Sequence, residues 1–459
     1  MATVPSKRVA VIGAGLTGLV AIKENLSEGS SVQCFEKLGH IGASGPTARK
    51  PPKADFPLDP ARYPDYFSHY LQLRYLNEYA DHFKVKKHIR FNTQVLQCVP
   101  AAQGGWTLEV QEKDGEREEH HFDALICASG ALATPVTPDF AGRESFRGEL
   151  LHSHHYRTPS PFEGKRVAII GLGAPRSSNP ELASSQRGTM ASDQAGQSHR
   201  RKAAQGAGMR ARASRAEPDD PRGLLRKVRT GVVKVHRASV EALNETGLAL
   251  STNVQLDVDV IICATGYSLT DMPYLPRDAV ASRELAAPHI DLYKFMVSPW
   301  YEDLYVLGRL EVFGPHASAA EAQSRVAAAM ISGKLAKPGH EEMMKSIKAN
   351  RHKISNNFVD TPRHFLTVHS VEYIDDLLAP LGCAPSVGKV LGQMFRGNPI
   401  RALSLFKAVY FGIPCSGQWR LFGYGRNQKL AEATIFRIAH GEGELSKAEQ
   451  EAIGAVASA

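Results

Sequence analysis

The sequence predicts an α/β fold in which a smaller parallel-sheet unit is inserted into a larger one. Two phrases, each occurring twice and in the same order, carry this prediction. An apolar run that breaks into Gly-x-Gly occupies Lys7–Gly15 and again Lys165–Gly173. An Asp followed by an apolar run that ends at a small hydroxyl residue and Gly occupies Asp123–Gly130 and again Asp259–Gly266. Continuous apolar runs are typical of buried parallel strands, so each pair of phrases marks one unit.

The order of the elements follows from the local patterns. Alternating apolar and polar residues on both sides of Asp114-Gly115 predict a hairpin whose first strand is Trp106–Gln111. In the first unit we further expect a strand over residues 8–15, a helix over 16–28, and strands over 31–36, 89–95 and 122–128. After the second unit we expect a strand over 304–307 and helices over 319–331 and 371–379.

These elements divide the chain into three parts. Residues 1–158 form the first part of the larger unit, residues 159–266 form the inserted unit, and residues 267–459 return to the larger unit and continue into a helical C-terminal region. Each unit has the strand–turn–helix pattern of a Rossmann-like dinucleotide-binding domain.

Composition limits the possible classes of protein. With 459 residues and 43% hydrophobic residues, the chain resembles a globular protein with sizeable cores. Charges interrupt every apolar run longer than a strand, which argues against a membrane span and a signal peptide. The six cysteines never form Cys-x-x-Cys, so a dithiol reductase is disfavoured. Cys34, Cys127 and Cys263 lie in predicted buried strands, which favours reduced thiols in the cytoplasm.

One segment departs from the α/β pattern. Residues 174–223 contain no Val, Ile, Phe, Tyr or Trp, and they cannot bury enough apolar area to offset the entropy of ordering, so we expect disorder. Residues 174–229 hold twelve Lys/Arg and five Asp/Glu, and thus +7 of the net charge of +8. No aromatic residues interleave with these basic residues, which argues against nucleic-acid binding.

The first glycine-rich turn is a strong dinucleotide signal. In Gly13-Ala14-Gly15-Leu16-Thr17-Gly18, the first glycine permits the tight turn, the second lets the backbone approach a pyrophosphate, and the third lets the helix pack closely. The helix N-terminus then binds the anion. Glu36 ends the next strand 18 residues beyond Gly18, where a carboxylate accepts hydrogen bonds from ribose hydroxyls.

The second turn is weaker. Ala174, Pro175 and Arg176 follow Gly171-Leu172-Gly173, so the third glycine is missing, and both a working and a vestigial nucleotide site remain open. Thr265-Gly266 fits either a crossing between the two units or an ordinary turn at the end of a strand. His152, His154 and His155 have no carboxylate or Cys cluster beside them, so a linker between units is favoured over a metal site.

Together these motifs resemble the flavin-containing monooxygenase family nearly from end to end. The first glycine motif with Glu36-Lys37 is similar to the family's FAD motif. Phe146-x-Gly148-x-x-x-His152-x-x-x-Tyr156 and Ala264-Thr265-Gly266-Tyr267 are similar to two further signatures. Similar counterparts exist for Glu321-Ala322-Gln323-Ser324-Arg325, Tyr373-Ile374-Asp375-Asp376-Leu377 and Gly417-Gln418-Trp419.

The resemblance implies an FAD-dependent, NADPH-using monooxygenase. It would oxygenate soft nitrogen or sulfur nucleophiles with O2 through a flavin C4a-hydroperoxide, with the protein supplying placement and a dry site. Two alternatives stay open: an FAD-binding protein without turnover, and a Baeyer–Villiger or N-hydroxylating relative. No catalytic residue and no metal ligand is assigned, and substrate identity, oligomeric state and peripheral membrane association stay open. The candidate cofactor-binding residues are Gly13, Ala14, Gly15, Leu16, Thr17, Gly18, Glu36, Lys37, Val95, Gly130, Gly171, Gly173, Thr265 and Gly266.

The chain departs from the family pattern at two places. After Ile41-Gly42 the family's Gly-Gly-x-Trp is absent, and no Asn occurs between Asn25 and Asn77, so the active-site loop is shortened. Residues 174–223 replace the family's arginine-bearing NADPH segment. Both departures are abrupt, and our hypothesis is a gene-model or splicing error, in which one stretch was dropped and one was read from an intron or in a shifted frame. Sequencing the transcript tests it, since a transcript encoding residues 174–223 as written would refute it.

Overall fold

The central sheet of the molecule is parallel and five-stranded. The computed structural model describes residues 6–42, 56, 63, 69–113, 115–171, 227–286, 289–313, 316–357, 366–392 and 398–440. Except for the edge strand Ile89–Arg90, the strands of the sheet carry mostly buried apolar side chains, as expected where both faces are covered. In the order in which they lie, the strands are β16 (Leu304–Val306), β7 (Ala124–Cys127), β1 (Arg8–Ile12), β2 (Ser31–Phe35) and β3 (Ile89–Arg90).

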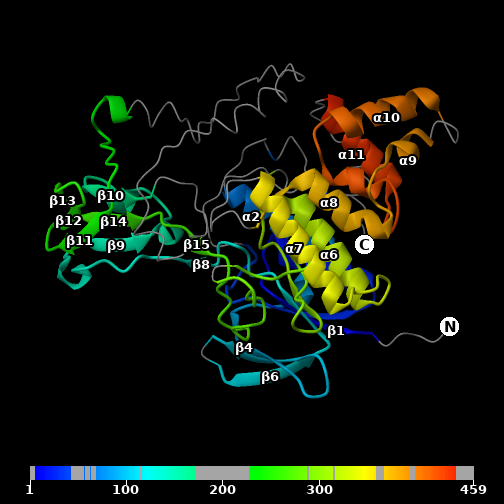
Figure 1. Ribbon diagram of the computed structural model, residues 1–459, viewed down its shortest axis with the longest axis horizontal. Coiled ribbons are helices and arrows are strands. Elements are labelled where there is room, and N and C mark those ends of the chain that lie inside the picture. The colour runs from blue at the N-terminus through cyan, green and yellow to red at the C-terminus, as the bar shows by residue number, and fades with distance from the viewer. Residues whose placement is uncertain are drawn as a thin grey trace.

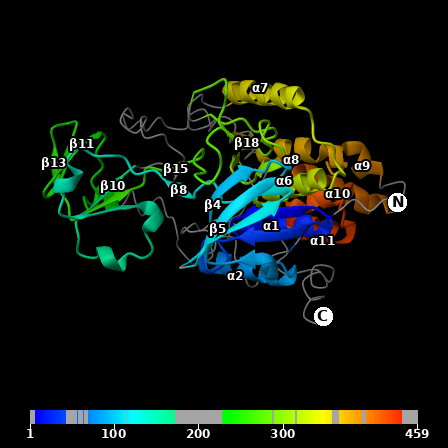
Figure 2. The same cartoon turned by 90° about the horizontal axis from the view of Figure 1, so that it is seen from below.

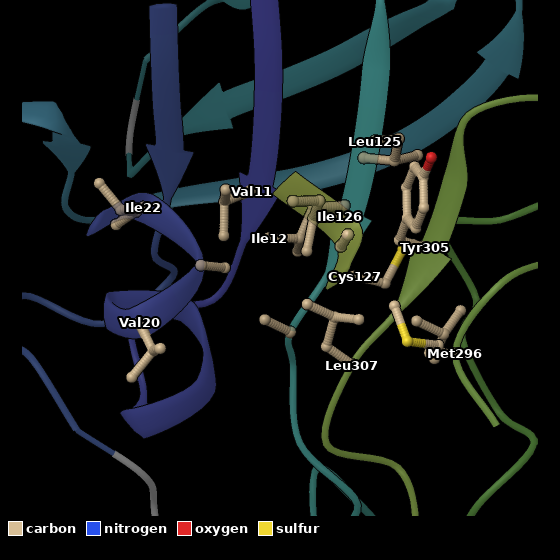
Figure 3. Close-up of a cluster of buried hydrophobic side chains, with 14 of the residues drawn as sticks. Val11, Ile12, Val20, Ile22, Leu125, Ile126, Cys127, Met296, Tyr305 and Leu307 are labelled. Carbon is tan, nitrogen blue, oxygen red and sulfur yellow. The ribbon is translucent and has the colours of Figure 1, made fainter. Parts of the chain in front are cut away.

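The core lies where helix α1 (Leu16–Ser27) meets this sheet. Val11 and Ile12 of β1 lie between side chains of α1 and of β7, and Tyr305 of β16 closes the cluster (Figure 3). α1 also packs on α6 (His316–Ile331), so the N-terminal part and the returning part of the chain share one core. Among the described residues, the larger unit also contains α2 (His69–His82), α7 (His340–Asn357) and α8 (Ser370–Leu378).

Smaller elements complete the larger unit. β4 (Thr93–Pro100), β5 (Trp106–Glu112) and β6 (Arg117–Phe122) form an antiparallel sheet, which confirms the predicted hairpin. β17 (Glu311–Phe313) pairs with β18 (Thr367–His369). The C-terminal lobe contains α9 (Val387–Leu391), α10 (Pro399–Phe411), the short helix η7 (Ser416–Arg420) and α11 (Gln428–His440).

A second parallel sheet stands apart from this body (Figures 1 and 2). Its strand order is β10-β14-β9, and an antiparallel sheet β11-β12-β13 lies beside it. β8 (Thr134–Pro135) and β15 (Tyr267–Ser268) pair where the chain crosses between the units. The strands of the second unit are β9 (Glu149–His152), β10 (Val167–Ile170), β11 (Val240–Asn244), β12 (Gly247–Leu250), β13 (Gln255–Asp257) and β14 (Val260–Cys263).

Two expectations differ from the observed elements. The single strand expected over residues 89–95 is wrong, because Asn92 has a φ of 53° and breaks it into β3 and β4. β9 precedes residue 159, yet it hydrogen bonds to β14 of the second sheet. We therefore propose that the boundary between the units lies before β9.

All six cysteines are free and buried. Burial raises the pKa of Cys127 to about 12 and the pKa of Cys263 to about 11. Cys127 and Cys263 therefore stay protonated in the folded protein. In the described part of the chain, no helix combines the length and apolar character needed to cross a bilayer.

Candidate cofactor site

The turn after β1 is shaped by a glycine in the left-handed region. Gly13 has a φ of +100°, and a Cβ placed on it would lie 2.9 Å from the carbonyl oxygen of Ala128. The Gly13 amide donates to the Phe35 carbonyl at 2.9 Å. The turn is therefore pressed between the ends of β2 and β7, where only glycine fits without strain.

The two later glycines of the motif differ in their surroundings: one faces open space and the other is tightly packed. Gly15 is the N-cap of α1, it has no side chain to cap the helix, and no atom lies within 4 Å of a Cβ placed on it. A Cβ on Gly18 would lie 1.8 Å from the Gly13 carbonyl oxygen. Gly18 thus closes the helix onto the turn, whereas Gly15 leaves open space in front of the first helical amides. Open space at a helix N-terminus suits an anion.

Glu36 is held against this turn. Its side chain is buried, one carboxylate oxygen accepts from the Ala14 amide at 2.7 Å, and the other accepts from the Leu38 amide at 2.9 Å. Each oxygen has a second lone pair, so the carboxylate can also accept from a ligand hydroxyl. The neighbouring Lys37 is exposed.

Two residues that the sequence analysis missed lie beside the same turn. Gly308 follows β16 with a φ of +74°, and a Cβ on it would lie 2.6 Å from the Thr17 hydroxyl oxygen. Arg309 is only 2% exposed, and its guanidinium donates to the carbonyls of Asp271 and Leu269. The position of Gly308 directly after a predicted strand could have indicated it from the sequence, whereas no sequence pattern indicates Arg309.

The other candidates of the first unit lie further along the strands. Gly130 follows β7 with a φ of +81° and has open space around it. Val95 is buried in β4, opposite Val110, where the pairing with β5 shifts register. The structure therefore gathers Gly13, Glu36 and the start of α1 into one place, with Gly130 at the same edge of the sheet and Val95 in a different sheet.

The second unit repeats the first turn. Gly171 has a φ of +101°, and a Cβ on it would lie 2.5 Å from the Ala264 carbonyl oxygen. The Ala264 amide donates to the Ile170 carbonyl at 2.8 Å, as the Ala128 amide donates to the Ile12 carbonyl at 2.9 Å. Leu172, Gly173 and the expected disordered segment 174–223 lie outside the described residues. The turn at Gly171 thus has the geometry of the turn at Gly13.

The two strands of each repeat are also joined at their beginnings in the same way. A carboxylate oxygen of Asp123 accepts from the Arg8 amide at 2.6 Å, and a carboxylate oxygen of Asp259 accepts from the Arg166 amide at 2.8 Å. The Arg166 side chain also pairs with Asp259, and its hydrogen bonds lower the pKa of that carboxyl to about 2. The Asp that opens each repeated phrase therefore fixes the register of a parallel strand pair.

Thr265 and Gly266 lie at the crossing between the units. The Thr265 hydroxyl donates to the Val136 carbonyl at 2.5 Å, and the Val136 amide donates to the Gly266 carbonyl at 3.0 Å. Directly beyond, Tyr267 packs on the rings of His152 and His154. Burial lowers the pKa of both histidines, which keeps them neutral. In the residues that the structure describes, no group of three or more His, Cys, Asp or Glu is arranged to hold a metal.

A buried network of ion pairs and hydrogen bonds anchors α1 to α6 and to the C-terminal lobe. The Arg420 guanidinium donates to carboxylates of Glu24 and Glu321, each at 2.7 Å. Gln323 accepts from the Gly308 amide at 2.8 Å and donates to the Tyr373 hydroxyl at 2.8 Å. Arg325 donates to the carbonyls of Trp419 and Tyr424. The Glu-x-Gln-x-Arg sequence of α6 thus ties the turn side of the sheet to α8 and to the C-terminal lobe.

Comparison with known families gives two matches. The flavin-binding monooxygenase-like family matches residues 52–199 and 203–440. The NAD(P)-binding Rossmann-like domain matches residues 11–82, which include the first turn and α1. The first of these matches covers most of the chain, and it includes most of residues 174–223.

Relatives of similar length exist. Flavin-containing monooxygenase 5 of Mus musculus is 27% identical over 497 residues, covering 92% of this chain and 90% of the relative. Dimethylaniline monooxygenase [N-oxide-forming] 2 of Oryctolagus cuniculus is 26% identical, with 92% and 90% covered. The structure of S-allyl-L-cysteine S-oxygenase from Allium sativum superposes with a TM-score of 0.59 at 21% identity, covering 88% of this chain and 94% of that chain.

Proposed function

The chain belongs to the flavin-binding monooxygenase-like family, and we propose that its FAD lies with the pyrophosphate over the N-terminus of α1. It is an FAD-dependent, NADPH-using monooxygenase that acts on a small molecule with O2. The observation that supports the placement of FAD is the contrast between the open space at Gly15 and the close contact at Gly18. An anion fits the open space, and the helix amides face it.

Different residues around this turn hold different parts of the cofactor. The amides at the start of α1 bind the pyrophosphate, and the Glu36 carboxylate, oriented by the Ala14 and Leu38 amides, accepts from a ribose hydroxyl. Gly130 leaves room for the cofactor at the end of β7. When bound, FAD supplies the oxygen-activating chemistry, and the protein supplies binding, orientation and exclusion of water.

NADPH is assigned to the second turn. Gly171 has the φ and the close carbonyl contact that Gly13 has, which fits the start of a second dinucleotide site. Thr265 and Gly266 lie where the paired crossing strands β8 and β15 meet that unit. These residues set how the two units, and so the two cofactors, face one another.

The substrate class is a soft nitrogen or sulfur nucleophile. The name of the rabbit relative specifies N-oxide formation, which supports oxygenation at nitrogen. In this chemistry the cofactor carries the reactive oxygen, so the chain requires no acid, base or nucleophile of its own.

Gly15→Val tests the FAD placement. The valine side chain would occupy the space in front of α1, so the purified variant should lack flavin absorbance and should not consume NADPH. Gly339→Val is the matched control. Gly339 also accepts the first helical hydrogen bond of its helix, α7, and no atom lies within 4 Å of its Cβ position. If Gly15→Val purified with as much FAD as Gly339→Val, the placement would be wrong.

A further inference from the structure

Two stretches of chain connect the second unit to the larger unit. The departing crossing, residues 128–135, runs from the end of β7 through β8. The returning crossing, residues 264–271, runs from the end of β14 through β15 and back to the larger unit. Because β8 pairs with β15, the two crossings lie side by side between the two parallel sheets (Figures 1 and 2). The contacts that hold them on the larger unit therefore set the direction in which the second unit stands.

One buried side chain contacts both crossings on the larger unit. Arg309 is 2% exposed, and one terminal nitrogen of its guanidinium donates to the Leu269 carbonyl. The other terminal nitrogen donates to the Asp271 carbonyl at 3.2 Å and lies 3.5 Å from the Ser129 hydroxyl oxygen. The two carbonyls belong to the returning crossing and the hydroxyl belongs to the departing one. A single guanidinium thus joins the two crossings to the end of β16.

A tyrosine makes a second connection at the same place. The hydroxyls of Tyr274 and Ser129 lie 2.9 Å apart and share a hydrogen bond. The main-chain carbonyl of Tyr274 accepts from the Cys98 amide of β4 at 2.7 Å. Tyr274 follows the returning crossing by three residues, so this bond also joins one crossing to the other. We call Arg309, Tyr274 and Ser129 the crossing clasp.

The chemistry of Arg309 fits bridging better than it fits packing. The hydrogen-bond partners of its guanidinium are neutral, and its Nε has no hydrogen-bond partner among the described residues. Burying a charge against neutral groups costs free energy, and here burial lowers the pKa of the arginine. A methionine would fill the same space without that cost. The planar fork of a guanidinium can hold two carbonyls at once, which the single nitrogen of lysine cannot do in the same way.

The crossing clasp lies next to the first dinucleotide turn. Gly308, which directly precedes Arg309, is so close to Thr17 of α1 that a Cβ on it would lie 2.6 Å from the threonine hydroxyl oxygen. The bonds of Arg309 therefore connect the turn proposed to hold FAD with the segment that returns from the unit proposed to hold NADPH. A small rotation at this point would be amplified along the second unit.

We propose that Arg309 is a positioning residue, which holds both crossings so that a nicotinamide bound by the second unit reaches the flavin. The inference rests on the proposed function, because hydride transfer requires the two cofactors to meet. Arg309 exchanges no atom and no electron in that step. Its effect is geometric, and a misplacement of about 1 Å between reacting groups can slow a reaction about a hundredfold.

Spin-label distances test the positioning without any turnover. Lys113→Cys and Thr252→Cys place one label on each unit, at exposed positions, in the full-length protein with its flavin. The six native cysteines are buried, and the protein without the two added cysteines measures any background labelling. The unsubstituted clasp should give a narrow distribution of distances. Arg309→Met should broaden it, and Arg309→Lys should broaden it as well, because lysine keeps the charge but cannot bridge two carbonyls.

Anaerobic reduction by NADPH tests the consequence for the reaction. In Arg309→Met and Arg309→Lys the limiting rate of flavin bleaching should fall about tenfold or more. The NADPH concentration that gives half of this rate should stay as in wild type, because the turn at Gly171 is unchanged. The midpoint potential of the flavin should also stay unchanged. Tyr274→Phe removes one hydroxyl and should slow bleaching about threefold, which keeps the test available if the Arg309 variants fail to fold.

A matched control separates positioning from loss of stability. Arg351→Met removes another bridging guanidinium, which joins α7 to Ser282 and Asp291. It should lower the free energy of unfolding but leave the label distances and the bleaching rate as in wild type.

Three results would overturn the proposal. The first is a distance distribution in Arg309→Met as narrow as in the parent protein, and the second is bleaching of that variant at the wild-type rate. The third is a lowered midpoint potential in Arg309→Met with full recovery of rate in Arg309→Lys, because the charge would then act on the flavin directly. If NADPH failed to reduce even the wild type, the proposed function would be wrong, and the label distances would still test whether the clasp sets the position of the second unit.

Discussion

At the scale of single residues, the first glycine motif contains three glycines that are needed for three different reasons. Gly13 needs its left-handed φ, Gly15 needs the space in front of it, and Gly18 needs to have no Cβ because the Gly13 carbonyl is in the way. The motif predicts all three residues but does not predict how the cost of replacing them divides between folding and binding.

Gly18→Ala should therefore destabilise the protein itself. A Cβ 1.8 Å from the Gly13 carbonyl oxygen forces the helix away from the turn, at a cost of about 1–3 kcal/mol in the free energy of unfolding. Urea denaturation of flavin-free protein measures this cost without a contribution from the cofactor. Gly15→Val, measured in the same way, should cost less, since its Cβ meets no protein atom and only the preference of an N-cap for glycine over valine is lost.

Gly388→Ala is the control for helix propensity. Gly388 lies inside α9 with no atom within 4 Å of its Cβ position, so alanine there should be neutral or stabilise by about 0.5–1 kcal/mol. If Gly18→Ala proved as harmless as Gly388→Ala, the close contact between α1 and the turn would not exist in solution.

At the scale of elements, α1 is fixed by charged groups that the sequence separates widely. Glu24 of α1 and Glu321 of α6 share the guanidinium of Arg420, which lies at the end of η7. Burial alone would raise the pKa of Glu24, but Lys23 and Arg420 outweigh it and lower that pKa from 4.5 to about 2. The ionised carboxylate is therefore the form that stabilises the fold.

This network predicts a pH dependence of stability. Because the folded pKa of Glu24 lies below its unfolded value, its contribution is complete above 4.5 and is lost as the pH falls toward about 2. The loss is on the order of 3 kcal/mol. Urea denaturation across this pH window should show a steeper decline for wild type than for Glu24→Gln, which cannot titrate.

Glu341→Gln serves as the control for that experiment. Glu341 lies in the first turn of α7 and is exposed, so its substitution should leave the pH dependence as in wild type. Equal slopes for wild type and Glu24→Gln would show that Glu24 is not ionised by its neighbours in the folded protein.

The sequence predicted elements best where both faces of a strand are buried. β1, β2, β7 and β14 carry short apolar runs and were located to within a few residues. The break at Asn92 was missed because it depends on one left-handed residue. α7 and the helices of the C-terminal lobe were not predicted individually, since their burial depends on partners distant in sequence.

The residues of the candidate site also differ in how well the sequence predicts them. Gly13, Glu36 and Gly18 were predictable because one continuous strand–turn–helix motif contains them. Gly308 and Gln323 were not assigned to the site, because they reach the turn only through the return of the chain to the central sheet. A local pattern cannot reveal a contact of that kind.

At the scale of the whole molecule, function requires the two units to act together. The repeated turns at Gly13 and Gly171 belong to different sheets, and paired crossing strands β8 and β15 connect them. A monooxygenase of this family needs the reduced nicotinamide to meet the flavin, so electron transfer between the cofactors tests the second unit directly.

NADPH added without oxygen should rapidly bleach the flavin absorbance of the purified protein. The expected reason is hydride transfer from a nicotinamide that the second unit binds. Dithionite, which reduces flavin without any binding site, is the control on the same sample. Bleaching by dithionite but not by NADPH would indicate an FAD-binding protein without turnover.

The six buried thiols have a practical consequence. Because an enclosed sulfur is out of reach of alkylating reagents and peroxide, the intact protein should tolerate the oxidants that an oxygen-using enzyme releases when its turnover is uncoupled. Modification of these sulfurs would require the protein to open first. The rate of thiol labelling under native conditions would then measure how often each region opens, without any engineered probe.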